Sequence, residues 1–522
     1  MYGDGNINQE KLDGFVNTFN MKLNPENRWI QMSRLVPWKA FEEKYAKCFK
    51  KDGRRAKTAR EALGALVVQQ LLNLTDRETV EIIQENPYIQ YFLGYTEFRL
   101  NPTFDASTMV HFRKRISFDM TQEINEMLRE KMENEHPQPQ ENEPNEPNEQ
   151  NQEDNDDDAN ASQTPEHSQT DQKTNDVDKP NQGKLLLDAT CVPSDIRYPT
   201  DLSLLNEARE KTEKMIDIIW EHLKEPNRKK PKTYRKRARK AYLKKAKKRG
   251  KKGFRKAVGK QLNYLKRDLN HLDKLIQEAN EKGIENIYTQ REIELMAIIR
   301  ILYAQQQEMY DNKTHRIDDR IVSIGQPWTR PIVRGKAKAP VEFGAKLEIS
   351  VVNGFSTIEK ISWDNFNESQ GLMASVERYK AKYGYYPEAV LADQLYRNRK
   401  NLAYCNERGI RLSGPRLGRP PKDEKKTKAH KKLTYQDSCE RNEVEGKFGV
   451  AKRKFSLDCL KTKLKETSET IIGLTFFTMN LKSFYRSSLN FFVIFLFLAK
   501  FTYFFDVLRD FASKKRYFAF SC

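Results

Sequence analysis

Three acidic residues occupy positions from which they could bind a divalent metal ion. Asp188 ends the apolar stretch "KLLLD", Asp393 ends "AVLAD", and Glu445 lies on a basic helical stretch late in the sequence. Carboxylate oxygens are hard ligands that suit Mg²⁺. Two such ions about 3.5–4 Å apart can activate an attacking oxygen and stabilise a leaving one at a phosphodiester. A strand-terminal Asp is also a common turn former, so each acid alone is weak support for a metal site.

The helical stretch "CERNEVEGKFGVAKRKF" separates two of its acids by register. At about 100° per residue, Glu445 lies about 40° from Arg441 and about 20° from Lys452, whereas Glu443 points to the far side. Two explanations of this stretch stay open. It is either a solvated helix with an i,i+4 ion pair from Arg441 to Glu445, or a helix that places a metal ligand beside cations that contact phosphate groups.

The elements around these acids follow an informative order. A strand ending at Asp188 is followed by a hairpin of two strands joined at Asn353-Gly354, and then by a helix and a strand ending at Asp393. A short helix, a short strand and the helix with Glu445 come next. This is the order of a ribonuclease-H-like core, in which two adjacent strand ends and one helix bring three carboxylates together. We therefore predict an α/β fold with Asp188, Asp393 and Glu445 as catalytic and metal-binding residues.

The stretch before this core has helical periodicity. Residues 1–130 form a predicted helical N-terminal domain for DNA binding or assembly. Single helices are expected at 75–94, which opens with a Thr75–Glu78 capping box, and at 105–132.

Composition defines the remaining parts of the chain. Residues 133–180 lack large apolar side chains, and 131–181 are predicted to be a disordered acidic linker. The catalytic domain is predicted at 182–486, with a long basic helical insertion at 202–312 after its first strand and a further strand at 320–325. A hydrophobic C-terminal segment, 487–522, follows it.

The formal net charge of +20 is unevenly distributed. Residues 133–180 hold 15 acids and two lysines, so the rest of the chain carries a net charge of +33. Between Arg228 and Lys260 there are 19 Lys or Arg and no acid. A body this basic predicts a polyanionic partner, and nucleic acid is the first candidate. The interleaved aromatic residues could stack on bases or pack against neighbouring helices; they are Tyr234, Tyr242 and Phe254.

Cysteines and apolar runs exclude other classes of protein. Six cysteines without a C-x-x-C pair indicate neither a zinc site nor a disulfide framework, and a reducing cytoplasm fits. The apolar run Phe491–Ala499 has nine residues, fewer than the ~20 that cross a membrane. We expect this run to be a buried helix or strand of the last domain and expect no membrane partner.

The motifs around the acids resemble those of the DDE transposases of bacterial insertion sequences. In the Y-R-E-K group of that family, the helix with the third acid carries a Y-x-x-R-x-x-x-E-x-x-x-x-x-x-K pattern. Arg441, Glu445 and Lys452 match it, while Ser438 replaces the tyrosine and Tyr435 lies one turn earlier. Similar stretches are "LLLDAT", "VLADQLY", "RPIVRGKAKAPVEFGAKLEISVVNGFS" and the region from "NRWIQMSRLVPW" to "FRKRIS".

The resemblance implies a DNA transposase that cleaves transposon ends and transfers strands into target DNA. It implies two Mg²⁺ ions, replaceable by Mn²⁺, on the three acids, with Arg441 and Lys452 on transposon-end phosphates. The implied partners are double-stranded DNA (terminal inverted repeats and target) and a second copy of the chain in a homodimer. The implied location is the nucleoid in the bacterial cytoplasm. Further candidate DNA-binding residues are Arg330, Arg334, Lys336, Arg237, Lys244, Lys245, Lys247 and Lys248.

Two other functions fit the same residues. One is a ribonuclease-H-like nuclease that cleaves DNA without strand transfer, which the acids do not distinguish from a transposase. The other is a non-catalytic DNA-binding protein derived from a transposase. Three carboxylates close to DNA argue against the second alternative, because a binding protein has no need of them.

Overall fold

The computed structural model describes residues 22–50, 55–135, 180–246, 251–333, 341–415 and 424–488. Most of the predicted acidic linker and of the C-terminal segment, with its apolar run, lies outside these ranges. Arg334, Lys336, Lys247 and Lys248 also lie outside them, as does the side chain of Lys245. Among the helices of the described residues, none combines the length and the apolar character that a membrane crossing demands.

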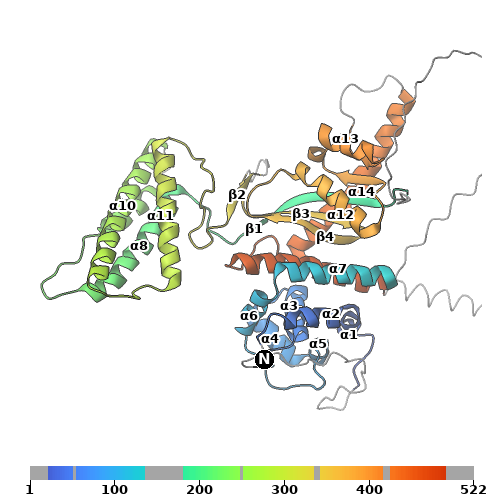
Figure 1. Cartoon of the computed structure of the whole chain (residues 1–522), viewed down its shortest axis with the longest axis horizontal. Coiled ribbons are helices and arrows are strands. Elements are labelled where there is room, and N and C mark those ends of the chain that lie inside the picture. The colour runs from blue at the N-terminus through green and yellow to red at the C-terminus, as the bar shows by residue number, and fades with distance from the viewer. Residues whose placement is uncertain are drawn as a thin grey trace, which may run out of the picture.

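In the described residues, six strands form one mixed sheet at the centre of the molecule (Figure 1). They are β1 (Lys184–Pro193), β2 (Arg330–Val333), β3 (Val341–Val352), β4 (Phe355–Ser362), β5 (Ala389–Ala392) and β6 (Arg411–Leu412). β1 pairs in parallel with β5 and antiparallel with β3, which also pairs antiparallel with β2 and β4. β6 pairs in parallel with β5. This mixed α/β topology is consistent with the predicted ribonuclease-H-like core.

The hairpin between β3 and β4 is confirmed at the predicted turn. Asn353 and Gly354 have φ of 49° and 78°. Positive φ at both central residues is typical of the tight two-residue turn that matches the twist of the flanking strands, and Asn-Gly favours it. The turn therefore sets the register of β3 with β4.

Alternation of side chains along β1 decides which residues meet which helix. Leu185 and Leu187 belong to the buried cluster of α12 (Leu372–Tyr383) and α13 (Arg399–Glu407), whereas Leu186 belongs to the cluster of α14 (Glu424–Lys454). Successive side chains of a strand point to opposite faces. Asp188 therefore shares the face of Leu186, which α14 covers.

The N-terminal part is helical, as predicted, but two predicted single helices are each divided. Its helices are α1 (Arg28–Leu35), α2 (Trp38–Ala46), α3 (Ala59–Leu72), α4 (Asp76–Glu85), α5 (Pro87–Phe92), α6 (Thr108–Arg115) and α7 (Phe118–Glu135). The Thr75–Glu78 capping box is confirmed. The prediction of one helix over 75–94 is wrong because the Asn86 side chain caps a new helix that begins at Pro87. The helix predicted over 105–132 is likewise interrupted, by Ile116 in an extended conformation.

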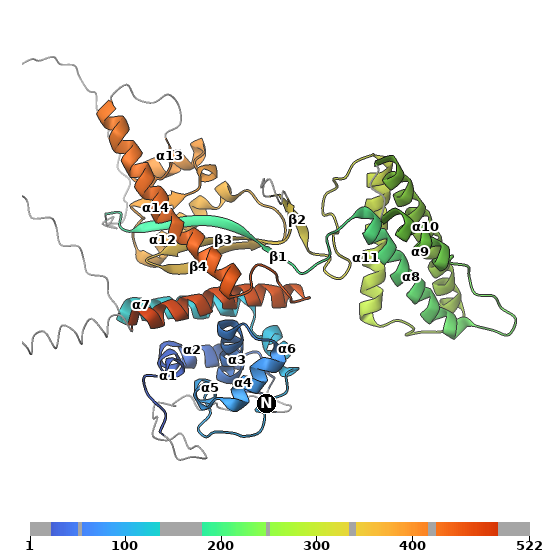
Figure 2. The same ribbon diagram turned by 180° about the vertical axis from the view of Figure 1, so that it is seen from behind.

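The described residues between β1 and β2 contain four helices, packed as a bundle that projects from the sheet (Figure 2). They are α8 (Asp201–Leu223), α9 (Arg235–Ala246), α10 (Lys251–Glu281) and α11 (Gln290–Asp311). The strand predicted at 320–325 is wrong. Its apolar residues Ile321 and Ile324 pack in the core of the bundle instead, and the strand that pairs with β3 is β2.

The N-terminal helices share one hydrophobic core with the helix at 465–488. Leu474, Phe477 and Phe484 of that helix lie in the same buried cluster as Phe41 and Leu66 of the N-terminal helices. Both views show α7 beside this helix, between the sheet and the remaining N-terminal helices (Figures 1 and 2). The N-terminal helices and the sheet are therefore held together by packing as well as by chain connectivity.

A glycine and two asparagines fix this contact. A Cβ at Gly473 would lie 1.9 Å from Thr121 Oγ1 of α7, so only glycine allows the two helices to approach this closely. Asn480 Nδ2 donates to Asn125 Oδ1 at 2.8 Å, and Asn480 Oδ1 accepts from the Ser356 N–H of β4 at 3.0 Å. These buried bonds join α7, β4 and the helix at 465–488.

We expect a protease site inserted between residues 136 and 179 to yield two fragments that stay associated after cleavage, because their shared core remains buried. Size-exclusion chromatography of the cleaved protein measures this. Gly473→Ala should release the fragments or lower the unfolding temperature, since its methyl group overlaps Thr121. Gly446→Ala, whose Cβ would have no neighbour within 4 Å, is the matched control. Fragments that separate in the otherwise unchanged protein would contradict the shared core.

Candidate active site

The parallel pairing of β1 with β5 brings the first two acids together. The last register pair of these two strands is Leu187 with Ala392. Asp188 and Asp393 are therefore the next residues along the two neighbouring segments. β5 ends there, whereas β1 continues beside β3 to Pro193. The prediction that Asp188 ends its strand is therefore wrong. Asp188 lies within β1, where the strand loses its parallel neighbour.

A cavity of about 610 Å³ adjoins these acids and α14. Both aspartates line it, together with three predicted residues of α14: Arg441, Glu445 and Lys452. Glu443 lies outside the cavity, with its Oε1 3.9 Å from Lys447 Nζ. Lys452 Nζ donates to Thr190 Oγ1 of β1 at 2.9 Å. The structure thus gathers the three predicted acids and two predicted cations around one cavity.

The surroundings of Asp188 disfavour its charge. Its side chain is 16% exposed, and burial is the main reason why its pKa rises to about 6, with smaller contributions from Glu368 and Asp393. The Ala189 N–H, which donates to Asp188 Oδ1 at 2.8 Å, acts in the opposite direction. The charge of Arg441 also lowers this pKa.

Arg441 lies between two of the acids. Its Nη2 is 2.9 Å from Glu445 Oε1, and its Nη1 is 3.8 Å from Asp188 Oδ2. The i,i+4 ion pair between Arg441 and Glu445, one of the two explanations of this helix, is therefore present. It coexists with the position of Glu445 at the cavity, so the pair does not decide between the explanations.

Two further residues of the cavity escaped the sequence analysis. Glu368, in the short 3-10 helix η2 (Glu368–Gln370), adds a fourth carboxylate, and Lys346 Nζ of β3 lies 2.8 Å from its Oε1. Lys346 also donates to the Phe366 carbonyl at 2.7 Å. Neither had a distinctive signal, because Glu368 stands in a polar loop and Lys346 in an ordinary strand pattern.

Buried hydrogen bonds hold the loop after β5 against the sheet. Tyr396, in the 3-10 helix η3 (Gln394–Tyr396) that follows Asp393, donates its hydroxyl to Oε1 of buried Glu348 on β3 at 2.7 Å. Asn401 Nδ2 donates to the carbonyls of Tyr396 and Ser369, both at 2.8 Å. Because Ser369 follows Glu368, Asn401 links the two loops that carry acids to the cavity.

The side chains around the cavity suit a divalent metal ion in type. Three predicted carboxylates line it, and they are the hard oxygen ligands that Mg²⁺ prefers. Within the described part of the chain, no three His, Cys, Asp or Glu side chains form a group that could hold one ion. Glu445 pairs with Arg441 instead. The three acids therefore suit a divalent ion by their chemistry, and they line the same cavity. The carboxylate of Glu445, however, contacts Arg441 in this structure.

The other described candidates for DNA binding do not line this cavity. Arg330 Nη1 donates to the Thr329 carbonyl at 3.3 Å, and its Nε lies 3.6 Å from Asp364 Oδ1, so its side chain is engaged within the protein. Arg237 and Lys244 are exposed on α9 of the bundle. The described candidates for DNA binding thus lie partly on the sheet domain and partly on the bundle.

Asp188→Asn is expected to stabilise the folded protein at pH 7.5 in buffer without divalent ions. A folded pKa of about 6 against the ordinary Asp value of about 3.9 corresponds to at most about 3 kcal/mol. Because the folded pKa is the higher one, the gain should be complete above about pH 6, shrink as the pH falls, and vanish below about pH 4. Urea denaturation across this range measures it.

Asp458→Asn at an exposed position is the control for that measurement and should change stability little at any pH. A gain for Asp188→Asn that stayed constant from about pH 4 to 8 would show that the effect does not come from the charge of this carboxylate.

Two parts of the chain match families of transposases. Residues 390–482 match the family described as Transposase DDE domain, a range that includes Asp393, Arg441, Glu445 and Lys452. Residues 17–115 match the family described as Transposase domain (DUF772), which covers α1 to α6.

One curated relative and the solved structures complete the comparison. The Uncharacterized protein ORF8 in nfe locus of Rhizobium meliloti is 32% identical over 123 residues, which are 24% of this chain and 58% of the relative. The chain thus spans less than two thirds of that relative's length, and the relative's name assigns no activity. No solved structure matches the chain.

The family matches and the geometry meet on the same residues. The DDE match covers the second and third predicted acids, and the register of β1 with β5 adds Asp188 beside them. Two separate parts of the chain are thus similar to transposases, the C-terminal part to a transposase DDE domain and the N-terminal part to a further transposase domain.

Proposed function

We propose that this chain is a DDE transposase that cleaves DNA at transposon ends and joins the released ends to target DNA. One observation carries the proposal. Asp188, Asp393 and Glu445 line a single cavity with Arg441 and Lys452, and this cavity lies in a chain with two transposase family matches. The active complex is a homodimer on double-stranded DNA, because joining two transposon ends requires both to be held at once.

The residues of the cavity divide the work on a phosphodiester. Asp188, Asp393 and Glu445 would hold two Mg²⁺ ions, or Mn²⁺ in their place, which when bound activate the attacking oxygen and stabilise the leaving oxygen. Arg441 and Lys452 bind the adjacent phosphate groups of the transposon end. The bonds of Tyr396 and Asn401 keep the loop of Asp393 in place, which preserves the geometry that the reaction needs.

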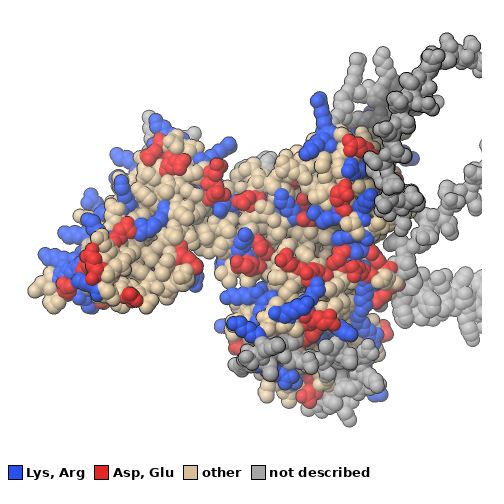
Figure 3. All heavy atoms as spheres, viewed as in Figure 1, with Lys and Arg blue, Asp and Glu red and all other residues tan. Residues whose placement is uncertain are grey.

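The bundle supplies a second surface for DNA. All five Lys and Arg residues of α9 between 236 and 244 are exposed, and the helix has no acid. Lys and Arg side chains gather along the outer part of the bundle in the space-filling view (Figure 3). Uncompensated cations of this kind attract the phosphate backbone without reading sequence. Arg237 and Lys244 therefore bind DNA away from the catalytic cavity.

The two alternatives differ in what the cavity does. A ribonuclease-H-like nuclease would cleave the same DNA but would not join the released ends to target DNA. A non-catalytic binding protein would neither cleave the DNA nor join its ends. The presence of three carboxylates on one cavity favours catalysis, because acids close to a DNA phosphate weaken binding unless cations compensate them. A reaction on linear DNA that carries the terminal repeats separates the three functions.

Asp188→Asn, Asp393→Asn and Glu445→Gln should each lower Mg²⁺-dependent cleavage of such DNA by about 1,000-fold or more, since each removes a metal ligand. DNA binding should persist in all three, because the loss of a negative charge does not weaken attraction to phosphate. Cleavage and strand transfer are followed on gels. Glu443→Gln, on the same helix but outside the cavity, is the matched control and should stay active; its inactivity would refute the assignment of Glu445.

Arg441→Ala and Lys452→Ala should weaken binding to transposon ends and reduce the slope of log K against log salt by about one unit each. Titrations at several salt concentrations measure this. Lys465→Ala, at an exposed position at the start of the helix at 465–488, is the control and should leave the slope as it is. Unchanged slopes for both cavity variants would limit Arg441 and Lys452 to their contacts within the protein.

A further inference from the structure

We propose that a groove at the start of α9 binds an unpaired stretch of a DNA strand, with the ring of Tyr234 as the stacking surface for one base. The groove has a volume of about 720 Å³ and lies beside the loop that joins α8 to α9. The inference rests on the proposed function only for the choice of DNA as ligand. It adds a binding site that cleavage at the cavity does not itself require.

The charge of the groove suits phosphate. Five of its lining residues are Lys or Arg, and two are acids. Both Lys230 and Arg235 pair with Asp217, which neutralises part of this charge. The remaining three cations, Lys232, Lys236 and Arg237, are exposed and form no ion pair with any residue that the structure describes. The groove therefore keeps a positive charge that attracts a nucleic acid backbone.

Tyr234 is presented to this groove in an unusual backbone conformation. The residue is 48% exposed and has a φ of 52°, a region in which a bulky side chain is an outlier. Such strain persists only where the surrounding structure enforces it, and it is concentrated at binding and active sites. An exposed aromatic ring that is strained into place beside free cations is suited to stacking on a base.

Contacts from α10 hold Tyr234 in this conformation. Arg267 Nη2 donates to the Thr233 carbonyl at 2.6 Å, and its guanidinium carbon lies 4.7 Å from the centre of the Tyr234 ring. Arg267 therefore lies over the ring of Tyr234 and supports it, while about half of the residue's surface stays accessible to solvent.

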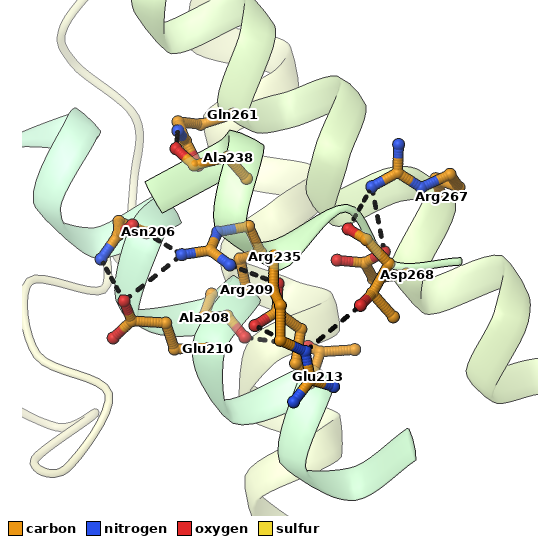
Figure 4. A network of polar contacts seen from close by, with 12 residues as sticks. Asn206, Ala208, Arg209, Glu210, Glu213, Arg235, Ala238, Gln261, Arg267 and Asp268 are labelled. Carbon is orange, nitrogen blue, oxygen red and sulfur yellow. Dashed lines mark hydrogen bonds and ion pairs between the residues drawn. The ribbon is translucent and has the colours of Figure 1, made fainter. Parts of the chain in front are cut away.

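A buried polar network fixes the start of α9 on the bundle (Figure 4). Gln261 Nε2 of α10 donates to the Ala238 carbonyl at 3.1 Å. Arg267 Nη2 lies 3.3 Å from Oδ1 of fully buried Asp268. Arg235 Nε of α9 lies 3.9 Å from Glu213 Oε2 of α8. A groove held by three helices loses little conformational entropy on binding.

The other two aromatic residues of the basic segment do not serve this purpose. Tyr242 and Phe254 pack against the hydrophobic core of the bundle. Of the three aromatic residues in the segment, Tyr234 alone is exposed. In duplex DNA the faces of the bases are covered by their neighbours, so a ring of this kind recognises an unpaired base, as at a frayed or cleaved end.

Fluorescence anisotropy tests the inference with the full chain in an Asp188→Asn background, in buffer without divalent ions. The probes are a labelled oligothymidylate strand and a blunt duplex of equal length. Tyr234→Ala should weaken binding of the strand by about tenfold or more and change binding of the duplex by less than about twofold, because the charge is unchanged. Tyr234→Phe should bind both probes as before, since its ring can still stack.

Tyr234→Gly separates binding from folding. Glycine adopts positive φ without strain, so this variant should unfold at no lower a temperature, yet lose affinity for the strand as Tyr234→Ala does. Equal loss for strand and duplex, with a lower unfolding temperature, would assign Tyr234 to holding α9 and overturn the proposal. Unchanged strand affinity in both variants would overturn it as well.

The outcome is independent of the proposed catalysis. Binding is measured without metal on a chain that lacks Asp188, so a failure to cleave transposon ends leaves the result for Tyr234 intact. Lys236→Gln is the electrostatic control, and it should flatten the salt dependence for strand and duplex alike. An unchanged salt dependence for both probes would show that Lys236 makes no phosphate contact, and would overturn the backbone contact assigned to the groove.

Discussion

The parallel register of β1 with β5 is the constraint on which the site depends. Its last pair is Leu187 with Ala392. Asp188 and Asp393 follow this pair directly and therefore lie on adjacent segments, although they are far apart in the sequence. A shift by one residue would turn Asp188 to the opposite face of the sheet. The leucines of β1 oppose such a shift, because Leu186 is buried in the cluster on one face of the sheet and Leu185 and Leu187 in the cluster on the other face.

The third acid depends on a second packing decision. α14 buries Val444, Phe448 and Ala451 against the sheet, and this apolar stripe fixes the rotation of the helix. Glu445 then faces the cavity while Glu443 does not. The ion pair of Arg441 with Glu445 adds little stability at an exposed position. Its importance lies in placing a guanidinium within reach of both Glu445 and Asp188.

The outer parts of the molecule relate to this core in different ways. The N-terminal helices share a buried cluster with the helix at 465–488, so their position is coupled to the sheet. The bundle has its own core, formed by α8, α10 and α11, and projects away from the sheet (Figures 1 and 2). A separate core allows the bundle to carry a strained residue such as Tyr234 without cost to the packing around the catalytic acids.

The sequence by itself determined the elements and the identity of the candidate acids. Apolar strands before Asp188 and Asp393, the Asn353-Gly354 turn and the helical register of Glu445 are local signals, and each depends on residues close in the chain. Local signals also failed where packing decided. Ile321 and Ile324 resemble a strand in pattern but fill the core of the bundle. The helix break at Asn86 depended on a cap and a proline that the apolar periodicity obscured.

Only the tertiary structure decided how these parts meet. It placed Asp188 within its strand, brought Glu368 and Lys346 into the cavity, and joined the N-terminal helices to the helix at 465–488. It also distinguished Tyr234, which is exposed, from Tyr242 and Phe254, which are packed. These outcomes arise from contacts between residues distant in sequence. Spacing and composition carry no information about such contacts until the sheet register and the helix packing are known.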